Sequence, residues 1–220
     1  MSPRRYHAPK RQSVTERTRR RIVDAVIKLH AQQGVTRTTY AMIAKRADVA
    51  IPTVYNHFPT MGDLLAACSG DVLTGAPPLG PPIFADVPDL DGRLRALARS
   101  LCAYYRYVAP WLRWSSHEAV LVPDIAARLE RMADARRQLV RLALEPAFGP
   151  RPPAPLMALS EILLDFQAWQ RLARDNDVAG DAVEIALAQA LLALARDHLA
   201  AAATDPAGES IALQRGRKPT

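Results

Sequence analysis

The chain has 220 residues, a mass of 24.1 kDa and a formal net charge of +7, with 49% hydrophobic and 23% charged residues. These proportions are those of a globular protein, so they exclude a wholly disordered chain. Because no run reaches about 18 apolar residues, we expect no membrane-spanning helix. Two cysteines, Cys68 and Cys102, are too few for a disulfide framework or a metal cluster, so we expect inert buried thiols in a reducing cytoplasm.

The excess positive charge lies at the N-terminal end. Residues 1–21 contain eight lysines and arginines against Glu16, whereas the remaining 21 basic and 21 acidic side chains lie in residues 22–220 and cancel. A basic end on a neutral body favours a polyanionic partner, either nucleic acid or an anionic membrane face, although a solvated tail has the same composition. No apolar stretch follows the first residues, so we expect a basic, disordered arm over residues 1–15 rather than a secretory signal.

Helical periodicity and capping signals delimit four helices behind this arm. Apolar residues at a spacing close to 3.6 predict a first helix, which Gly34 ends. Thr39 precedes the second helix as an N-cap, and Pro52 lies in the first turn of the third. Thr60 begins the fourth, with Asp63 as its partner in a variant of the capping box. The four helices are expected at about 14–33, 40–47, 51–57 and 60–73.

The rest of the chain also has helical patterning. Two proline blocks, 77–88 and 146–155, are expected to lie outside helix interiors, because proline lacks an N–H and crowds the preceding turn. Pro110 is expected to end another helix. Five helices are expected at about 90–108, 111–120, 125–142, 159–169 and 181–203. No stretch alternates with period 2, so the predicted fold class is all-α with about nine helices.

The segment 38–58 is the most informative part of the chain. It contains two short helices joined by a turn of three to four residues, which are the dimensions of a helix-turn-helix. The second helix presents hydrogen-bonding side chains of the length that reaches phosphates and base edges, namely Thr53, Tyr55, Asn56 and His57. Taken singly, Tyr55 can also be a packing aromatic, and the others can be solvent-facing residues. Their joint spacing favours DNA binding.

At these positions the chain resembles the TetR family of bacterial transcriptional regulators. The resemblance covers about residues 16–76, and a weaker one continues over 168–186. The residues that carry it are Ile22, Ala25, Gly34, Thr38-Thr39, Ile43-Ala44, Val49, Thr53-Val54-Tyr55, His57-Phe58 and Asp63-Leu64-Leu65. The resemblance implies an all-helical homodimer with a DNA-binding domain at 16–76 and an effector-binding and dimerisation domain at 77–203. The tail 204–220 is expected to be disordered.

Three positions depart from the family pattern. Asp48 stands where a turn glycine is usual, but aspartate tolerates a left-handed backbone better than most residues. Ala50 replaces the usual serine or threonine, so we expect a weaker cap before the recognition helix. Met61 replaces a lysine that typically touches a phosphate. The arm residues Arg4, Arg5, Lys10 and Arg11 are expected to compensate for the missing contact, since each neutralised phosphate releases counterions.

These observations predict three sets of site residues. The predicted DNA contacts are Arg4, Arg5, Thr38, Thr39, Thr53, Tyr55, Asn56 and His57. The predicted effector-binding residues are Tyr104, Trp111, Trp114, Met132 and Phe166. An aromatic residue is more often part of the core, but the resemblance to the family implies an effector cavity among the helices that carry these five. The predicted dimer interface is Leu187, Leu191 and Leu194, on a last helix that is apolar nearly all round and so must be covered on more than one side.

The resulting functional hypothesis is a cytoplasmic, ligand-responsive repressor. An apolar or aromatic small molecule is expected to release it from a palindromic double-stranded DNA operator, through the helix from Thr60 as the only covalent path between the domains. An architectural DNA-binding protein without an effector is the alternative. An all-helical enzyme is disfavoured, because the chain has no Gly-x-Ser-x-Gly, Gly-rich phosphate loop or His-x-x-x-His. We expect no cofactor, no metal site and no membrane partner.

Overall fold

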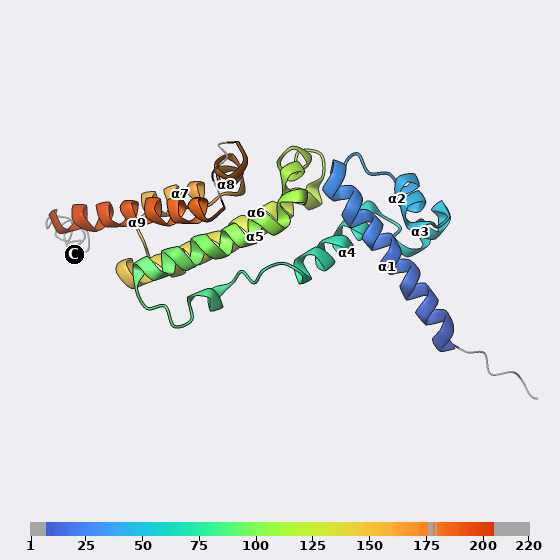
Figure 1. Ribbon diagram of the computed structural model, residues 1–220, viewed down its shortest axis with the longest axis horizontal. Helices are drawn as coiled ribbons and strands as arrows, with labels where there is room; N and C mark the ends of the chain where they lie inside the picture. The colour runs from blue at the N-terminus through green and yellow to red at the C-terminus, as the bar shows by residue number, and fades with distance from the viewer. Residues whose placement is uncertain (1–7, 176–177, 179, 205–220) are drawn as a thin grey trace, which may run out of the picture. The chain divides into compact units, whose positions relative to one another are not determined.

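The computed structural model describes residues 8–175, 178 and 180–204 of the chain (Figure 1). Every regular element in these ranges is helical, which confirms the all-α prediction. The α-helices are α1 (Ala8–Gln33), α2 (Tyr40–Ala47), α3 (Ile51–His57), α4 (Met61–Thr74), α5 (Leu90–Glu118), α6 (Pro123–Phe148), α7 (Ala154–Leu163), α8 (Phe166–Gln170) and α9 (Gly180–Thr204). A 3₁₀ turn at Pro81–Phe84 and a π-type turn at Arg171–Asp175 complete the described secondary structure.

The chain divides into two compact units that are not contiguous in sequence. Unit 1 comprises residues 1–77 and 106–131, and unit 2 comprises residues 78–105 and 132–220. The first break coincides with the expected boundary after residue 76, but residues 106–131 group with the N-terminal helices instead of with the expected second domain. The chain passes between the units three times, so the helix from Thr60 is not the only covalent link, contrary to expectation.

Unit 1 is built around the apolar face of α1. Ile22, Val26 and Leu29 are buried along this face at helical spacing. They pack in one cluster with residues of the following helices and with a single buried residue of α6. The other large members of this cluster are Ile43, Val54, Phe58, Leu64, Leu65 and Ile125. The presence of Ile125 shows that the segment 106–131 completes the core of unit 1 rather than lying on its surface.

Unit 2 is a helical layer in which α5, α6, α7 and α9 each contribute buried leucines. The largest of these fully buried residues are Leu94, Leu97, Leu101, Leu144, Leu156, Leu164 and Leu191. Two hydrogen bonds to backbone carbonyls tie the helices together. A guanidinium N–H of Arg93 in α5 donates to the carbonyl of Leu142 in α6 at 2.8 Å, and the buried Tyr105 hydroxyl donates to the carbonyl of Leu164 at 2.8 Å.

The structure corrects two helix boundaries that prolines suggested. Pro110 lies inside α5, so the expected helices at 90–108 and 111–120 are one helix of 29 residues. Pro146 lies near the end of α6, within a block expected to be outside helices. A proline removes one backbone hydrogen bond and strains the turn before it, and tertiary contacts can outweigh that cost. In α5 the residues after Pro110 make such contacts with α1, described below.

Two further boundaries differ from the sequence pattern. The single helix expected at 159–169 is split into α7 and α8, because the Asp165 side chain accepts a hydrogen bond from the Gln167 amide at 2.8 Å and caps a new helix. The helix α1 starts at Ala8 instead of Val14, so residues 8–15 are helical and not part of a disordered arm. The predicted contacts Arg4 and Arg5, and the tail after Thr204, lie outside the described residues.

Candidate nucleic-acid interface

The turn between α2 and α3 is held in a left-handed conformation. Asp48 ends α2 with φ 52° and ψ 56°, which confirms that it takes the place of a turn glycine. Arg21 of α1 donates to the Asp48 carbonyl at 2.8 Å and to its carboxylate at 3.0 Å. Both side chains are exposed, so the pair adds little free energy, but it fixes the turn to α1 and therefore sets the direction of α3.

The helices α3 and α4 differ in how their first turns are capped. Ala50 precedes α3 without a side-chain cap, as expected, and Pro52 lies in the first turn. Thr60 caps α4 through a complete capping box: its hydroxyl accepts from the Asp63 amide at 3.1 Å, and the Asp63 carboxylate accepts from the Thr60 amide at 3.0 Å. The predicted capping box is therefore confirmed.

The helix α3 turns its apolar residues inward and its polar residues outward. Val54 is fully buried and Phe58, which follows the helix, is nearly so. On the opposite face Tyr55 is 48% exposed, Asn56 is exposed, and Thr53 and His57 are half-buried. The four side chains predicted to contact DNA thus lie on one short helix, outside the core. Their contact with DNA stays a prediction.

Tyr55 also has a packing partner that sequence reasoning missed. Its ring stacks on that of Tyr40 in α2, with centroids 4.1 Å apart and planes only 3° from parallel. The Tyr40 hydroxyl donates to the Phe58 carbonyl at 3.1 Å, and burial together with neighbouring Tyr55 and Asp63 raises the pKa of Tyr40. Tyr40 therefore stays protonated and joins α2 to the end of α3, while Tyr55 is both packed and accessible.

The two threonines before α2 have different roles. Thr39 is exposed, and its hydroxyl accepts from the Met42 amide at 3.3 Å as the N-cap of α2, as predicted. Thr38 is only 4% exposed, and its hydroxyl donates to the Gly34 carbonyl at 2.7 Å. The structure corrects the predicted DNA contact of Thr38: its hydroxyl is used inside the unit, where it stabilises the turn between α1 and α2.

A known family model matches the part of the chain that contains α2 and α3. Residues 22–68, which run from the middle of α1 to the middle of α4, match the model of the bacterial regulatory proteins of the tetR family. The chain carries a TetR-family domain. The resemblance seen in the sequence is therefore confirmed.

Relatives of this TetR-family domain are found in curated proteins and in solved structures. Over 58 residues the chain is 40% identical to uncharacterised HTH-type transcriptional regulators of Mycobacterium tuberculosis and Mycobacterium bovis, covering 26% of this chain and 30% of theirs. It thus spans under a third of the length of these relatives. A tetR-family transcriptional regulator from Streptomyces coelicolor has a TM-score of 0.57 at 19% identity, covering 90% of this chain and 89% of that one. The multidrug binding protein EbrR complexed with imidazole has a TM-score of 0.56 at 22% identity, covering 88% and 97%. At these identities the likeness shows the fold.

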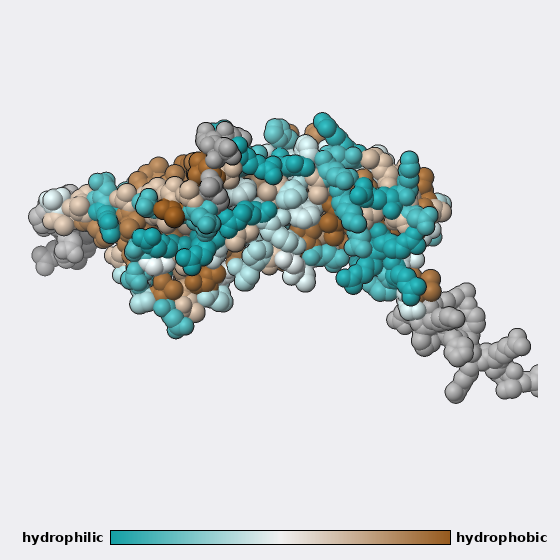
Figure 2. Space-filling model, viewed as in Figure 1, coloured by the Kyte–Doolittle hydropathy of each residue, from teal (hydrophilic) through white to brown (hydrophobic). Residues whose placement is uncertain are grey.

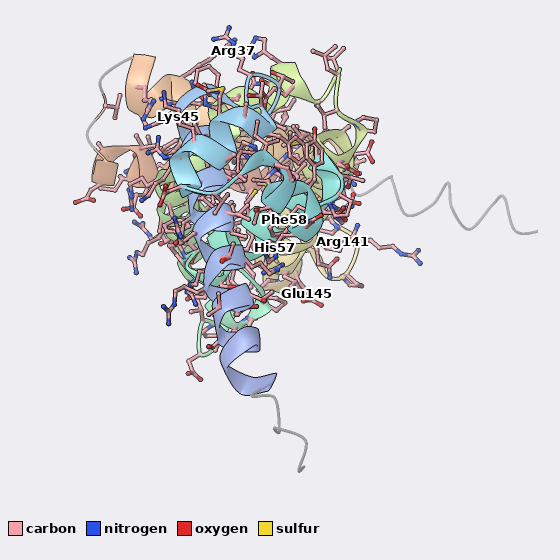
Figure 3. The ribbon with its side chains drawn as sticks, turned by 90° about the vertical axis from the view of Figure 1, so that its right-hand side faces the viewer. Arg37, Lys45, His57, Phe58, Arg141 and Glu145 are labelled. Atoms are coloured by element: carbon pink, nitrogen blue, oxygen red, sulfur yellow. The ribbon has the colours of Figure 1, made fainter. Side chains whose placement is uncertain are left out.

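The TetR-family domain exposes basic side chains that the sequence patterns did not single out. Figure 3 looks onto α1–α3 and shows Arg37, in the turn before α2, and Lys45, on α2, extending outward. Both are exposed. Arg19 of α1 lies over the Phe58 ring, 5.0 Å from its centroid. No motif marks these residues, because their position at the surface depends on how α1 and α2 pack.

The end of α5 is fastened to the turn between α1 and α2 by a buried carboxylate. Glu118 is 7% exposed, and its Oε1 accepts from the Thr36 amide at 2.8 Å and from the Thr36 hydroxyl at 2.9 Å. It lies directly against Gly34, whose φ is +84°, so that a Cβ at this glycine would collide with the carboxylate. A buried charge is retained only where hydrogen bonds satisfy it, and here both come from one turn of the TetR-family domain.

Three further side chains of α5 reach backbone carbonyls of α1. The Trp111 indole N–H donates to the Ile27 carbonyl at 3.0 Å, and the Arg113 guanidinium donates to the Ala31 carbonyl at 2.7 Å. The Trp114 indole N–H reaches the same Ala31 carbonyl at 3.4 Å. The two tryptophans predicted to line an effector cavity use their indole N–H groups to hold α5 on α1 within unit 1, and their contact with an effector stays a prediction. We call Trp111, Arg113, Trp114 and Glu118 together the α5–α1 clamp.

The other predicted effector residues lie in unit 2. Phe166 packs with Tyr105 and Trp169 in an aromatic cluster whose ring centroids are 5.5–5.8 Å apart. Tyr104 is buried and Met132 is half-buried. Burial raises the pKa of Tyr105 to about 12, so the hydroxyl in this cluster remains a donor. The five predicted residues are therefore divided between the two units, and the half-buried Phe166 packs against the rings of Tyr105 and Trp169.

Two of the three predicted dimer residues are buried within a single chain. Leu187 and Leu191 are 3% and 1% exposed in the core of unit 2, and Leu194 is half-buried, so the first two cannot be the surface of α9. Its large exposed apolar residues are Ile185, at 51%, and Leu199, at 37%. Figure 2 shows apolar surface over α7 and α9. By length and composition α9 also qualifies as a membrane-crossing helix, which the apolar-run count did not anticipate, although core helices of soluble proteins share both properties.

A buried histidine and cysteine meet inside the TetR-family domain. His30 of α1 is 3% exposed, and its Nδ1 lies 3.6 Å from the Sγ of Cys68 in α4. Its Nε2 has no hydrogen-bond partner in the described part of the chain. Burial lowers the pKa of His30 to about 4 and raises the pKa of the Cys68 thiol to about 11. The predicted burial of Cys68 and Cys102 is confirmed, and Cys68 remains an unreactive thiol.

Proposed function

We propose that the protein is a transcriptional regulator that binds a palindromic DNA operator as a homodimer and is released from it by a small molecule. The observation that carries this proposal is the outer face of α3. Polar side chains on that face project from a helix whose direction is set by the Arg21–Asp48 pair and by the Tyr40–Tyr55 stack. Such a helix, held rigidly at the surface of a unit with exposed Arg37 and Lys45, suits entry into the major groove.

Substitution on this face is expected to weaken DNA binding without unfolding the domain. Asn56→Ala and His57→Ala should each cost about 1–3 kcal/mol of operator affinity if they contact bases. Tyr55→Phe keeps the stack on Tyr40 and removes only the hydroxyl, so it separates a DNA contact from packing. Fluorescence anisotropy with DNA selected from the regulator's own upstream region measures the effect. Gln167→Ala, exposed on α8, is the control, and unchanged affinity in all three variants would refute the interface.

The N-terminal arm is expected to contribute electrostatic affinity. Deleting residues 2–7 removes Arg4 and Arg5 and leaves α1 intact. Binding should weaken for all DNA sequences alike, and the slope of log affinity against log salt should flatten by up to about 0.9 for each lost phosphate contact. Titrations at several salt concentrations measure this slope. An unchanged slope would show that the arm does not touch DNA.

The dimer is proposed to form through the exposed apolar residues Leu159 of α7 and Ile185 and Leu199 of α9. The two helices pack on each other, so two copies would build a four-helix bundle about a two-fold axis. Ile185→Glu together with Leu199→Glu should give a folded monomer, because both side chains are exposed. Light scattering after size exclusion measures the mass. Val120→Glu, at an exposed site in unit 1, is the control, and a dimer that survives the double substitution contradicts this interface.

The effector is proposed to act through the helices shared by the two units. Because α5 and α6 each contribute residues to unit 1 and to unit 2, a ligand that shifts either helix in unit 2 also acts on the α5–α1 clamp. The predicted residues Tyr104, Met132 and Phe166 remain candidates for that ligand's contacts. We expect a coupling of about 1–3 kcal/mol between ligand and operator.

A further inference from the structure

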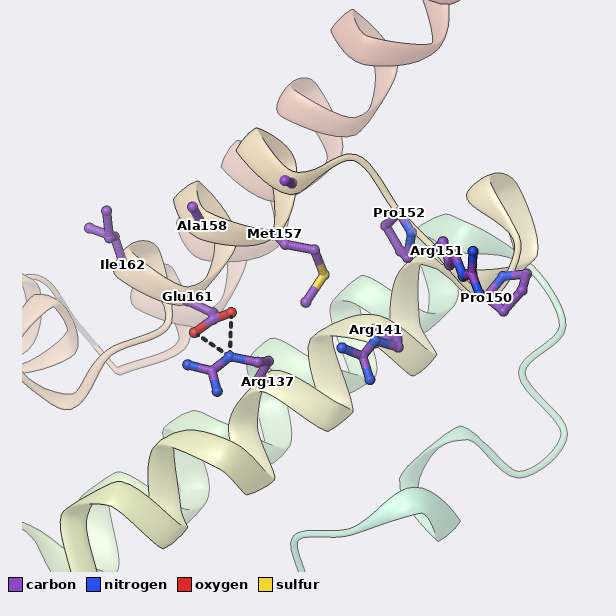
Figure 4. A pocket seen from close by; sticks show the side chains of 10 residues that line it. Arg137, Arg141, Pro150, Arg151, Pro152, Met157, Ala158, Glu161 and Ile162 are labelled. Atoms are coloured by element: carbon purple, nitrogen blue, oxygen red, sulfur yellow. Dashed lines mark hydrogen bonds and ion pairs between the residues drawn. The ribbon is translucent and has the colours of Figure 1, made fainter. Parts of the chain in front are cut away.

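A cleft in unit 2 lies apart from the residues predicted to bind the effector. It runs between α6 and α7 and is closed at one end by the proline-rich connection between them (Figure 4). Its volume is about 820 Å³, and small-molecule sites generally occupy about 300–1,000 Å³. The residues that line it are Arg137, Arg141, Pro150, Arg151, Pro152, Ala154, Met157, Ala158, Glu161 and Ile162.

The charges along the cleft are unevenly distributed. Arg137 is neutralised by two carboxylates, since it donates to Glu161 at 3.0 and 3.2 Å and to Asp134 at 2.8 Å. Arg141 donates only to the neutral Gln138 amide, at 3.4 Å, and neither Arg141 nor Arg151 has an ion-pair partner within the residues that the structure describes. Two uncompensated guanidinium groups therefore border the end of the cleft near the proline-rich connection.

Apart from the Arg137–Glu161 pair, the rest of the cleft is apolar. Met157 and Ala158 of α7 line it, as do the rings of the connection. Ile162 continues this surface one turn further along α7 and is 64% exposed, which is a large fraction for an isoleucine. Figure 4 shows Met157 between α7 and the two arginines of α6, so the apolar wall and the cationic end face the same space.

We propose that this cleft binds an organic anion with an apolar body, of the class of medium-chain carboxylates. The carboxylate accepts hydrogen bonds from Arg141 and Arg151, whose planar forks match its two oxygens. The alkyl chain lies on Met157 and Ile162 and removes their apolar surface from water. The Arg137–Glu161 pair joins α6 to α7 beside the chain and keeps the cleft at a constant width.

Decanoate, used below its micelle concentration, is the probe, and calorimetry on DNA-free protein is the measurement. Decanoate should bind with one site per chain, while decanol and decylamine should bind at least about tenfold more weakly, since they lack the carboxylate. Arg141→Gln and Arg151→Gln should each weaken decanoate binding about tenfold or more. Arg131→Gln, exposed on α6 outside the cleft, should leave it unchanged.

Two outcomes would overturn the proposal. Equal binding of decanoate and decanol, or equal decanoate affinity in the wild type and both glutamine variants, would show that the arginines hold no anion. A change of oligomeric state in Ile162→Glu, with no heat from decanoate in the wild type, would assign the cleft to a second copy of the chain. Because no DNA is present, neither result depends on whether the protein is a regulator.

Discussion

Replacing Gly34 with alanine is expected to destabilise unit 1 by about 2.5–5 kcal/mol. Two costs add up at this position. The φ of +84° disfavours any residue with a Cβ by about 1–2 kcal/mol. The new Cβ also collides with the Glu118 carboxylate, which must leave its hydrogen bonds with Thr36, and buried bonds to a charged group are worth about 1.5–3 kcal/mol. Denaturant unfolding, followed by the fluorescence of Trp111 and Trp114, measures the loss.

A double-mutant cycle separates the two costs. Glu118→Ala alone should destabilise unit 1, because it removes the acceptor of the partly buried hydrogen bond from the Thr36 amide. In that background Gly34→Ala should cost only the backbone contribution, since the colliding carboxylate is gone. Strictly additive losses would contradict a contact between the two residues. Trp169→Phe serves as the parent for all variants, because it removes the tryptophan of unit 2 from the signal.

Acidification is expected to destabilise unit 1 through His30. The unfolded chain binds a proton at this side chain near pH 6.5, whereas burial lowers the pKa in the folded protein to about 4. The stability due to neutral His30 is therefore complete above pH 6.5 and is lost as the pH falls from 6.5 to 4. The total loss is about 3 kcal/mol, at about 1.4 kcal/mol for each pH unit. Urea unfolding at several pH values measures it.

A leucine at position 30 removes the proton-binding group while keeping an apolar side chain of similar size. The free energy of unfolding of His30→Leu should fall by about 3 kcal/mol less than that of the wild type over the same pH window. His117→Gln is the matched control, because His117 is exposed at the end of α5. If His30→Leu follows the pH dependence of the wild type, burial of His30 is not the source of the acid sensitivity.

The α5–α1 clamp gives these predictions a functional consequence. His30 and Ala31 belong to the last turns of α1, Gly34 directly follows that helix, and Thr36 leads into α2. A change in the position of α5 therefore reaches the turn before the recognition helices through hydrogen bonds within unit 1. This route adds to the connection through α4, which the sequence alone suggested.

Local signals in the sequence determined much of the N-terminal unit. The bounds of α2 and α3, the left-handed Asp48, the uncapped start at Ala50 and the Thr60–Asp63 capping box all match expectation. Each depends on residues within a few positions of one another, so helix propensity, caps and apolar spacing contain the necessary information. The inward Val54 and outward Tyr55 and Asn56 follow from the same periodicity.

Features that depend on contacts between residues far apart in the sequence were decided only by the tertiary structure. The continuation of α5 through Pro110 is accompanied by bonds from Trp111 to α1 and from Glu118 to the turn after α1, more than 80 positions away in the chain. Trp111 and Trp114 therefore belong to the α5–α1 clamp, and the Thr38 hydroxyl donates to a backbone carbonyl within unit 1. On α9, apolar residues all round hide which face is covered, and only packing showed that Leu187 and Leu191 face inward while Ile185 does not. Burial depends on how the helices pack together. A hydrophobic pattern indicates that a side chain is buried, but it does not identify the residues that bury it.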